Sequence, residues 1–110
     1  MPKISQTAKT FTLVNVFTVA EGRQDELIRI LSNATDDFIA ARRGFISTTF
    51  HKGDDGKTVV NYAQWEARKD WKAMLATKKA KVHVAEVQAM IEAFQSTPCR
   101  VVKVHRAKRA

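Results

Sequence analysis

The sequence predicts one α+β domain with a ferredoxin-like arrangement, in which strands and helical regions follow the order β-α-β-β-α-β. Four short stretches are rich in β-branched and aromatic residues, as strands are. Between them, apolar residues recur at helical spacing in two regions. The stretch 53–56, G-D-D-G, has the composition of a hairpin turn and joins two of the strands directly. These features predict an antiparallel sheet with helices on one face.

The first half of the chain supplies two strands and the first helix. Residues 11–19, F-T-L-V-N-V-F-T-V, alternate in side-chain character and predict a strand. A helix over 24–41 follows, because its apolar residues form one stripe and the acidic Asp25 and Glu26 suit a first turn. Gly44 ends this helix, and a second strand is expected over 45–52.

The second half is predicted to hold the other two strands and the remaining helices. A strand over 57–66 follows the hairpin turn, and residues 68–75 predict a short helix. A longer helix is expected over 79–94, since apolar residues from Ala80 to Phe94 share one stripe. The S-T-P of 96–98 would break it, because proline lacks a backbone donor. The last strand is expected over 99–105, with Cys99 buried in it.

Length and composition indicate one globular domain. The chain has 110 residues, 45% of them hydrophobic and 27% charged. No apolar run approaches the roughly 20 residues of a membrane span, and the first ten residues lack the apolar centre of a secretory signal. The single cysteine excludes an internal disulfide and a cysteine-based zinc site. We expect a cytoplasmic protein with no membrane partner, a flexible arm at 1–10, one domain at 11–106 and a basic tail at 107–110.

The formal net charge of +8 raises the question of nucleic-acid binding. Basic residues are denser between 68 and 81 and again near the end of the chain. Charge runs of this kind are more often solvated surface than binding sites. A fragment at 43–45, R-G-F, echoes an RNA-binding signature but falls on the second predicted strand, where that signature does not belong. Nucleic acid is therefore the least favoured partner.

The third predicted strand carries the candidate site. Residues two apart share a face of a strand, so Val59, Asn61, Ala63 and Trp65 point one way. Asparagine is depleted in strands, and a buried amide without a partner costs about 1–3 kcal/mol. Asn61 therefore needs either a ligand or a partner in the protein, which could be the backbone or Asn15 on the neighbouring first strand.

The opposite face of the predicted sheet is also apolar. Its expected members are Val14, Val16, Val60 and Tyr62, with Ile46 and Phe50 as further candidates. Large apolar patches are rarely left exposed. The sequence therefore predicts a homodimer in which this face packs against the same face of a second chain.

Several segments together resemble the antibiotic biosynthesis monooxygenase (ABM) family. They are N-Y-A-Q-W at 61–65, G-F-I-S-T-T-F-H at 44–51, D-D-G-K at 54–57, N-V-F at 15–17 and A-E-G-R at 20–23. The resemblance covers roughly residues 11–94. It implies a dimeric α+β barrel and a monooxygenase that needs no cofactor. Such an enzyme oxidises a small aromatic substrate (a quinol, a phenol or an anthrone-like compound) to a quinone with O2.

The resemblance also implies roles for individual residues. Asn61 and Trp65 match the residues most associated with activity and are expected to be catalytic. The expected substrate contacts are Asn15, Phe50, His51, Trp71 and His83. The chain departs from the family pattern at Phe50 and Trp71, which replace tyrosines, and near Ala85, where an arginine is missing. The general base stays open: His51 and His83 are the nearest titratable candidates, and a substrate acidic enough to ionise unaided would need none.

A haem-binding or haem-degrading branch of the same superfamily is the alternative. Asn15 matches an asparagine of that branch, and His83 lies within about one residue of its haem-ligating histidine. Met74 falls at its tryptophan position, with Trp71 three residues earlier. Haem is thus the alternative cofactor, and a small-molecule binder without catalysis is a further possibility.

Overall fold

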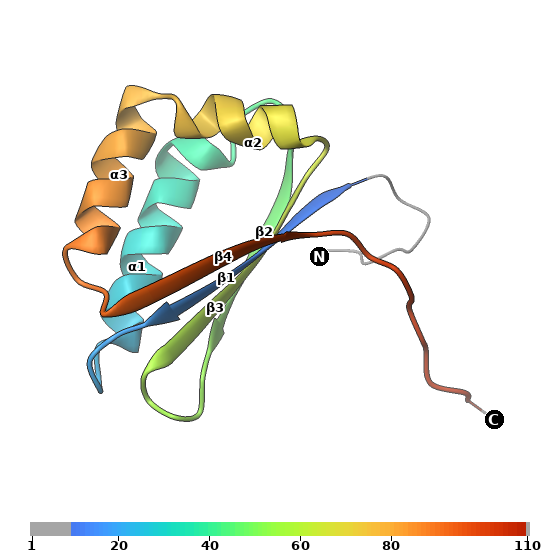
Figure 1. The fold of residues 1–110 in the computed structure, drawn as a ribbon, viewed down its shortest axis with the longest axis horizontal. Helices are drawn as coiled ribbons and strands as arrows, with labels where there is room; N and C mark the ends of the chain where they lie inside the picture. Colours follow the sequence, from blue (N-terminus) through green and yellow to red (C-terminus); the bar gives the residue numbers. More distant parts are fainter. Residues whose placement is uncertain (1–9, 110) are drawn as a thin grey trace.

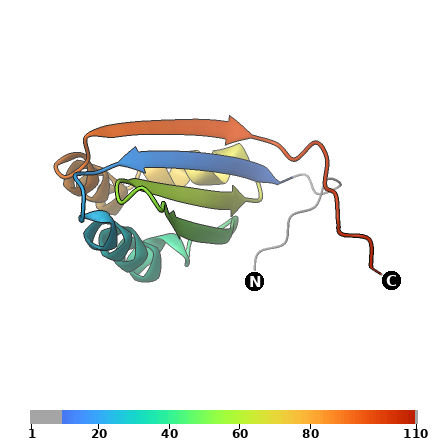
Figure 2. The same cartoon turned by 90° about the horizontal axis from the view of Figure 1, so that it is seen from below.

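The computed structural model describes residues 10–109 and confirms the predicted fold class (Figure 1). Its elements are β1 (Phe11–Thr18), α1 (Gln24–Ala34), the π-helix η1 (Thr35–Ile39), β2 (Phe45–Lys52), β3 (Thr58–Trp65), α2 (Arg68–Leu75), α3 (Lys78–Gln88) and β4 (Ala93–Cys99). The strands form one antiparallel sheet in the order β2-β3-β1-β4. All helices lie on one side of this sheet (Figure 2). The arm expected at 1–10 falls outside the described residues except for Thr10.

The core lies between the inner face of the central strands and the helices. One cluster joins Phe17 and Val59 of the sheet to Leu27 of α1 and Val87 of α3. A second cluster gathers Trp65, Met74 and Ala80 at the other end of the domain. The side-chain alternation predicted for β1 and β3 therefore holds, because their inward residues are the ones the helices cover.

A buried glutamine ties the start of α1 to the β2–β3 hairpin. The Gln24 amide nitrogen donates to the carbonyl oxygens of Gly53 and Thr58, each at 2.8 Å. On the same turn, the Asp55 carboxylate accepts from the backbone N–H groups of Lys57 and Thr58. Gly56 adopts a φ of 78°, a value that favours glycine. These contacts fix the hairpin that places β3 beside β2.

The predictions for the last helix and the last strand were wrong. α3 ends at Gln88 rather than at 94, and β4 covers Ala93–Cys99 rather than 99–105. Phe94 therefore leaves the helix stripe and stacks on Phe17 of β1, with ring centroids 4.9 Å apart. Proline is tolerated in β4 because this strand lies at the sheet edge. Cys99, expected to be buried, is exposed.

The first helix was also predicted too long, and one face assignment in β2 was wrong. α1 ends at Ala34 and continues as the π-helix η1. In β2 an irregularity between Phe45 and Ser47 shifts the alternation of side chains. As a result Phe50 pairs with Asn61 and packs on the core cluster beneath the helices, not on the outer face. Ile46 lies at the irregularity and is exposed.

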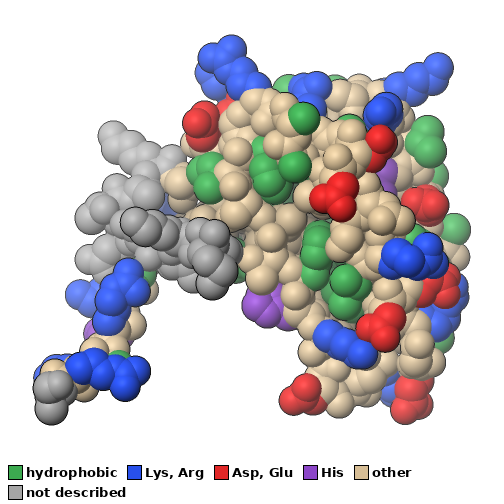
Figure 3. Space-filling model, turned by 180° about the vertical axis from the view of Figure 1, so that it is seen from behind, with side chains coloured by type: hydrophobic (Ala, Val, Ile, Leu, Met, Phe, Trp, Pro, Cys, Tyr) green, Lys and Arg blue, Asp and Glu red, His purple; other side chains and the backbone are tan. Residues whose placement is uncertain are grey.

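Residues 100–109 form no helix or strand and lead away from the sheet (Figure 1). Basic side chains near the end of this segment stand apart from the body of the domain (Figure 3). On the face that Figure 3 shows, the remaining lysine and arginine side chains are interspersed with aspartate and glutamate. Within residues 10–109, no helix is both long and apolar enough to cross a membrane.

Candidate active site

A cavity of about 390 Å³ lies between the inner face of the sheet and the helices. Its walls are mainly apolar and include Leu13 and Phe17 of β1, Met74 of α2 and Val87 of α3. The lining residues Leu75, Val84 and Phe94 are exposed and mark its mouth, between the helices and the edge strand β4. The cavity is therefore a concave, largely apolar site of the kind that takes small organic ligands.

Three polar side chains cross the sheet in one row on the cavity side. Asn15 of β1 lies opposite Asn61 of β3 and, on its other side, opposite Ser96 of β4. All three line the cavity. Residues directly opposite each other in antiparallel strands share a face, which is why this row forms. The row gives a largely apolar pocket a polar floor.

Asn61 is oriented by a neighbour on β2. The Thr48 hydroxyl donates to the Asn61 side-chain oxygen at 2.5 Å. This bond uses the carbonyl end of the amide and leaves its NH2 group for another acceptor. The sequence suggested Asn15 as the partner of Asn61. In the structure, the partner of the Asn61 side-chain oxygen is Thr48.

Asn15 is nine-tenths buried, with 9% of its surface exposed. Its side-chain oxygen is fully buried and has no hydrogen-bond partner among residues 10–109. Leaving a buried acceptor unpaired costs about 1–3 kcal/mol. Native proteins satisfy nearly all such groups, and the exceptions call for an explanation. Asn15 also lines the cavity, so a ligand donor that reached this oxygen would supply the missing bond.

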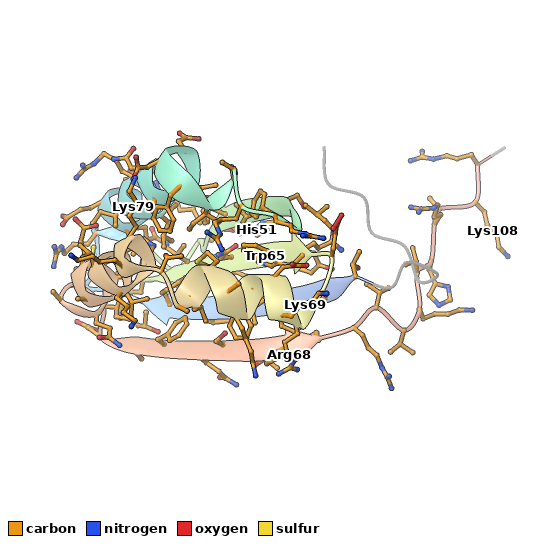
Figure 4. The ribbon with its side chains drawn as sticks, turned by 90° about the horizontal axis from the view of Figure 1, so that it is seen from above. His51, Trp65, Arg68, Lys69, Lys79 and Lys108 are labelled. Atoms are coloured by element: carbon orange, nitrogen blue, oxygen red, sulfur yellow. The ribbon has the colours of Figure 1, made fainter. Side chains whose placement is uncertain are left out.

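The two tryptophans occupy different environments. Trp65 (labelled in Figure 4) is 2% exposed and packs edge-on against Phe45, with ring centroids 5.3 Å apart. It does not line the cavity but borders a second hollow of about 70 Å³, which Asn15 and Asn61 also border. Trp71 is half-buried and borders both the cavity and this hollow. Of the two rings, Trp71 is the one that a ligand in the cavity can touch.

His83 of α3 lies between the cavity and the outside. It lines the cavity, and it also lines a surface groove of about 580 Å³ between α3 and the α1–η1 segment. Phe38 contacts its ring edge-on, with centroids 6.3 Å apart. Burial lowers the pKa of the His83 imidazole below its usual value, and the Glu86 carboxylate opposes part of this shift.

The structure brings together only part of the predicted site. Asn15, Asn61, Trp71 and His83 line one cavity, and Trp65 borders the adjoining hollow. His51 is exposed and pairs with Val60 on the opposite face of the sheet, so it lies away from the cavity. Phe50 packs on the core cluster and lines none of these spaces.

Sequence reasoning missed two polar residues of the site. Ser96 was placed in a helix break, although the alternation of Phe94, Ser96 and Pro98 along one face of a strand was the available signal. Thr48 was predicted to be in a strand, but its bond to Asn61 depends on the β2–β3 register.

The haem alternative places Asn15 and His83 on one cavity, and the structure does so. Haem also carries two propionates, which need cations or other donors nearby. Among residues 10–109, no lysine or arginine lines the cavity; Arg29, Lys78 and Lys79 line the groove on the other side of His83. The described lining of the cavity therefore offers no cation to a propionate.

Comparison with known proteins agrees with the fold. The family model of antibiotic biosynthesis monooxygenases matches residues 10–93. Tetracenomycin-F1 monooxygenase of Streptomyces glaucescens is 47% identical over 83 residues, which are 76% of this chain and 74% of that protein.

Among solved structures, SnoaB, a cofactor-independent oxygenase from Streptomyces nogalater, superposes with a TM-score of 0.78 at 22% identity. The match covers 88% of this chain and 97% of SnoaB. The monooxygenase ActVA-Orf6 of Streptomyces coelicolor, in complex with nanaomycin D, gives 0.76 at 22% identity and covers 89% and 92% of the two chains.

These findings define the class of protein. The chain belongs to the antibiotic biosynthesis monooxygenase family. It is an oxidoreductase of the monooxygenase type, built on the α+β fold of that family.

Proposed function

We propose that this protein oxidises a small aromatic substrate, a phenol, a quinol or an anthrone-like compound, to a quinone with O2 and without a cofactor. The observation that carries the proposal is the row of Asn61, Asn15 and Ser96 on the floor of an apolar cavity. The tetracenomycin relative and the nanaomycin-bound structure support an aromatic substrate of the polyketide type.

The reaction balances without any further oxidant or reductant. For an anthrone, the methylene group of the central ring and one O2 give a carbonyl group and one water. Loss of the proton from the phenolic tautomer leaves an electron-rich anion, which passes one electron to O2. The resulting radical and superoxide combine at the ring carbon, and protonation gives a hydroperoxide. Loss of the remaining C–H proton and cleavage of the O–O bond release water and leave the quinone carbonyl.

The residues of the cavity have matching roles in this reaction. The Asn61 NH2 group donates to the substrate oxyanion, in an orientation that Thr48 holds. The Asn15 oxygen accepts from a substrate hydroxyl, and the Trp71 ring lies against the aromatic plane. The apolar walls exclude water from the reacting centre. Trp65, which is buried beside this site, acts by positioning its neighbours.

The functional unit is proposed to be a homodimer. Val14, Val16, Val60 and Tyr62 point away from the helices and remain only half-buried. Packing this face against its copy would remove the apolar patch from water and close two sheets into the dimeric barrel that the family resemblance implies.

The direct test is oxygen uptake by purified protein, stripped of metal by a chelator, with an anthrone and with a small quinol. The expected result is consumption of one O2 for each anthrone converted to its quinone. Asn61→Ala should lower turnover by about 10²-fold or more, as loss of an oxyanion donor does. Asp54→Ala, at an exposed residue of the β2–β3 hairpin, is the control.

Two results would overturn the proposal. One is that neither substrate is oxidised faster than without protein. The other is a turnover that depends on added haem, with a stoichiometric Soret shift on titration.

A further inference from the structure

The proposed reaction begins with the loss of a proton from the substrate, and the polar row cannot accept that proton. Amide and hydroxyl side chains do not act as bases near neutral pH. Among the described residues that line the cavity, His83 is the only one with a titratable side chain other than a hydroxyl. A histidine is also the most frequent general base in enzymes.

The position of His83 gives it access to both sides of α3. One side of the residue borders the cavity and the other borders the groove toward α1 and η1. The substrate would enter at the mouth beside β4, where Phe94 is exposed. A proton taken inside the cavity can thus leave into the groove without crossing the mouth that the substrate fills.

Among residues 10–109, the charged groups that line a space beside His83 lie on the groove side. Arg29 of α1, Asp37 of η1, and Lys78, Lys79 and Glu86 of α3 line the groove, and the sheet contributes none to the cavity lining. Lys79, labelled in Figure 4, forms an ion pair with Asp37 at 3.4 Å across the groove. The cavity side is apolar, and burial lowers the pKa of the imidazole, which favours the neutral form that can accept a proton.

We propose that His83 is the general base of this enzyme, taking the proton of a substrate hydroxyl inside the cavity and passing it to water in the outer groove. The substrate O–H bond breaks, an N–H bond forms on the imidazole, and the electron pair stays on the substrate oxygen. The products of this step are a phenolate and an imidazolium. The imidazolium then loses its proton to water in the groove. The inference rests on the proposed function, because it assigns one step of that reaction.

The test is the pH dependence of oxygen uptake by the wild type and by His83→Gln, which is uncharged and of similar size. At neutral pH the glutamine variant should turn over about 10²- to 10⁴-fold more slowly, with little change in KM. The difference should shrink as the pH rises above the pKa of the substrate phenol, because the substrate then ionises unaided. His83→Ala should regain activity with added imidazole. His105→Gln, in the exposed tail, is the control.

The outcomes separate this inference from the proposed function. Oxygen uptake by His83→Gln with the wild-type rate and pH profile would overturn the role of His83 and leave the oxygenase intact. Loss of rate that is equal at every pH and is not rescued by imidazole would assign His83 a structural role instead. Absence of uptake by the wild type would overturn the proposed function itself. Should the glutamine variant fail to fold, the imidazole rescue and an acid limb in the wild-type profile decide the question.

Discussion

Asn15 and Asn61 lie directly opposite each other on β1 and β3, yet only one of the two side-chain oxygens has a partner. Thr48 on β2 supplies the donor for Asn61. The Asn15 oxygen has none among the described residues. The floor of the cavity therefore combines a fixed donor with an unfilled acceptor, which suits a ligand that carries both an oxyanion and a hydroxyl.

Asn15→Leu should lower turnover without lowering the stability of the protein. Leucine is close to asparagine in shape, and the substitution removes the buried oxygen that has no hydrogen-bond partner. The free energy of unfolding should therefore stay level or rise by up to about 1–3 kcal/mol. Turnover of the aromatic substrate should fall, because the hydroxyl loses its acceptor. Urea denaturation and oxygen uptake on the same preparation measure the two effects. A marked loss of stability would show that the protein already satisfies the Asn15 amide.

Thr48→Val should weaken catalysis through Asn61. Valine has the shape of threonine but cannot donate, so the Asn61 amide loses the bond that orients it. We expect a fall in kcat with a small change in KM, and a loss of about 0.5–1.5 kcal/mol in the free energy of unfolding. Thr49→Val, one residue along on the opposite face, is the matched control. Equal kinetics for the two variants would contradict the role given to Thr48.

Local sequence pattern predicted the central part of the fold and site. The alternation along β1 and β3 placed Asn15 and Asn61 on one inward face, since the period of a strand fixes this without knowledge of its neighbours. The hairpin turn then set β2 and β3 side by side.

The features that sequence missed depend on contacts between distant segments. Pro98 indicates a strand break unless β4 is known to lie at the sheet edge, so β4 and Ser96 were misplaced. The irregularity between Phe45 and Ser47 is set by pairing with β3, and it decides that Phe50 faces inward and His51 outward. No local pattern in 45–52 indicates that shift.

Tyr62→Glu should dissociate the proposed dimer. Tyr62 lies on β3, on the face away from the helices, and a carboxylate there would have to be buried against its own copy. Analytical ultracentrifugation should show a dimer for the wild type and a monomer for the variant at the same concentration. Lys81→Gln, on the exposed side of α3, lowers the net charge by the same one unit and is the control. A monomeric wild type would contradict the assignment of the outer face.

Stability should fall on acidification because of His83. Burial lowers the pKa of this imidazole in the folded state, so the unfolded chain binds the proton more readily. The contribution of His83 to stability is complete above its unfolded pKa of about 6.5 and is lost as the pH falls through the lower folded value. In His83→Gln this part of the pH dependence should disappear. Urea denaturation at a series of pH values between about 5 and 8 measures it for both proteins, with His105→Gln as the exposed control. Parallel plots of unfolding free energy against pH for the wild type and His83→Gln would show that the imidazole is protonated as easily in the folded protein as in the unfolded chain. That result would contradict the statement that burial favours the neutral imidazole.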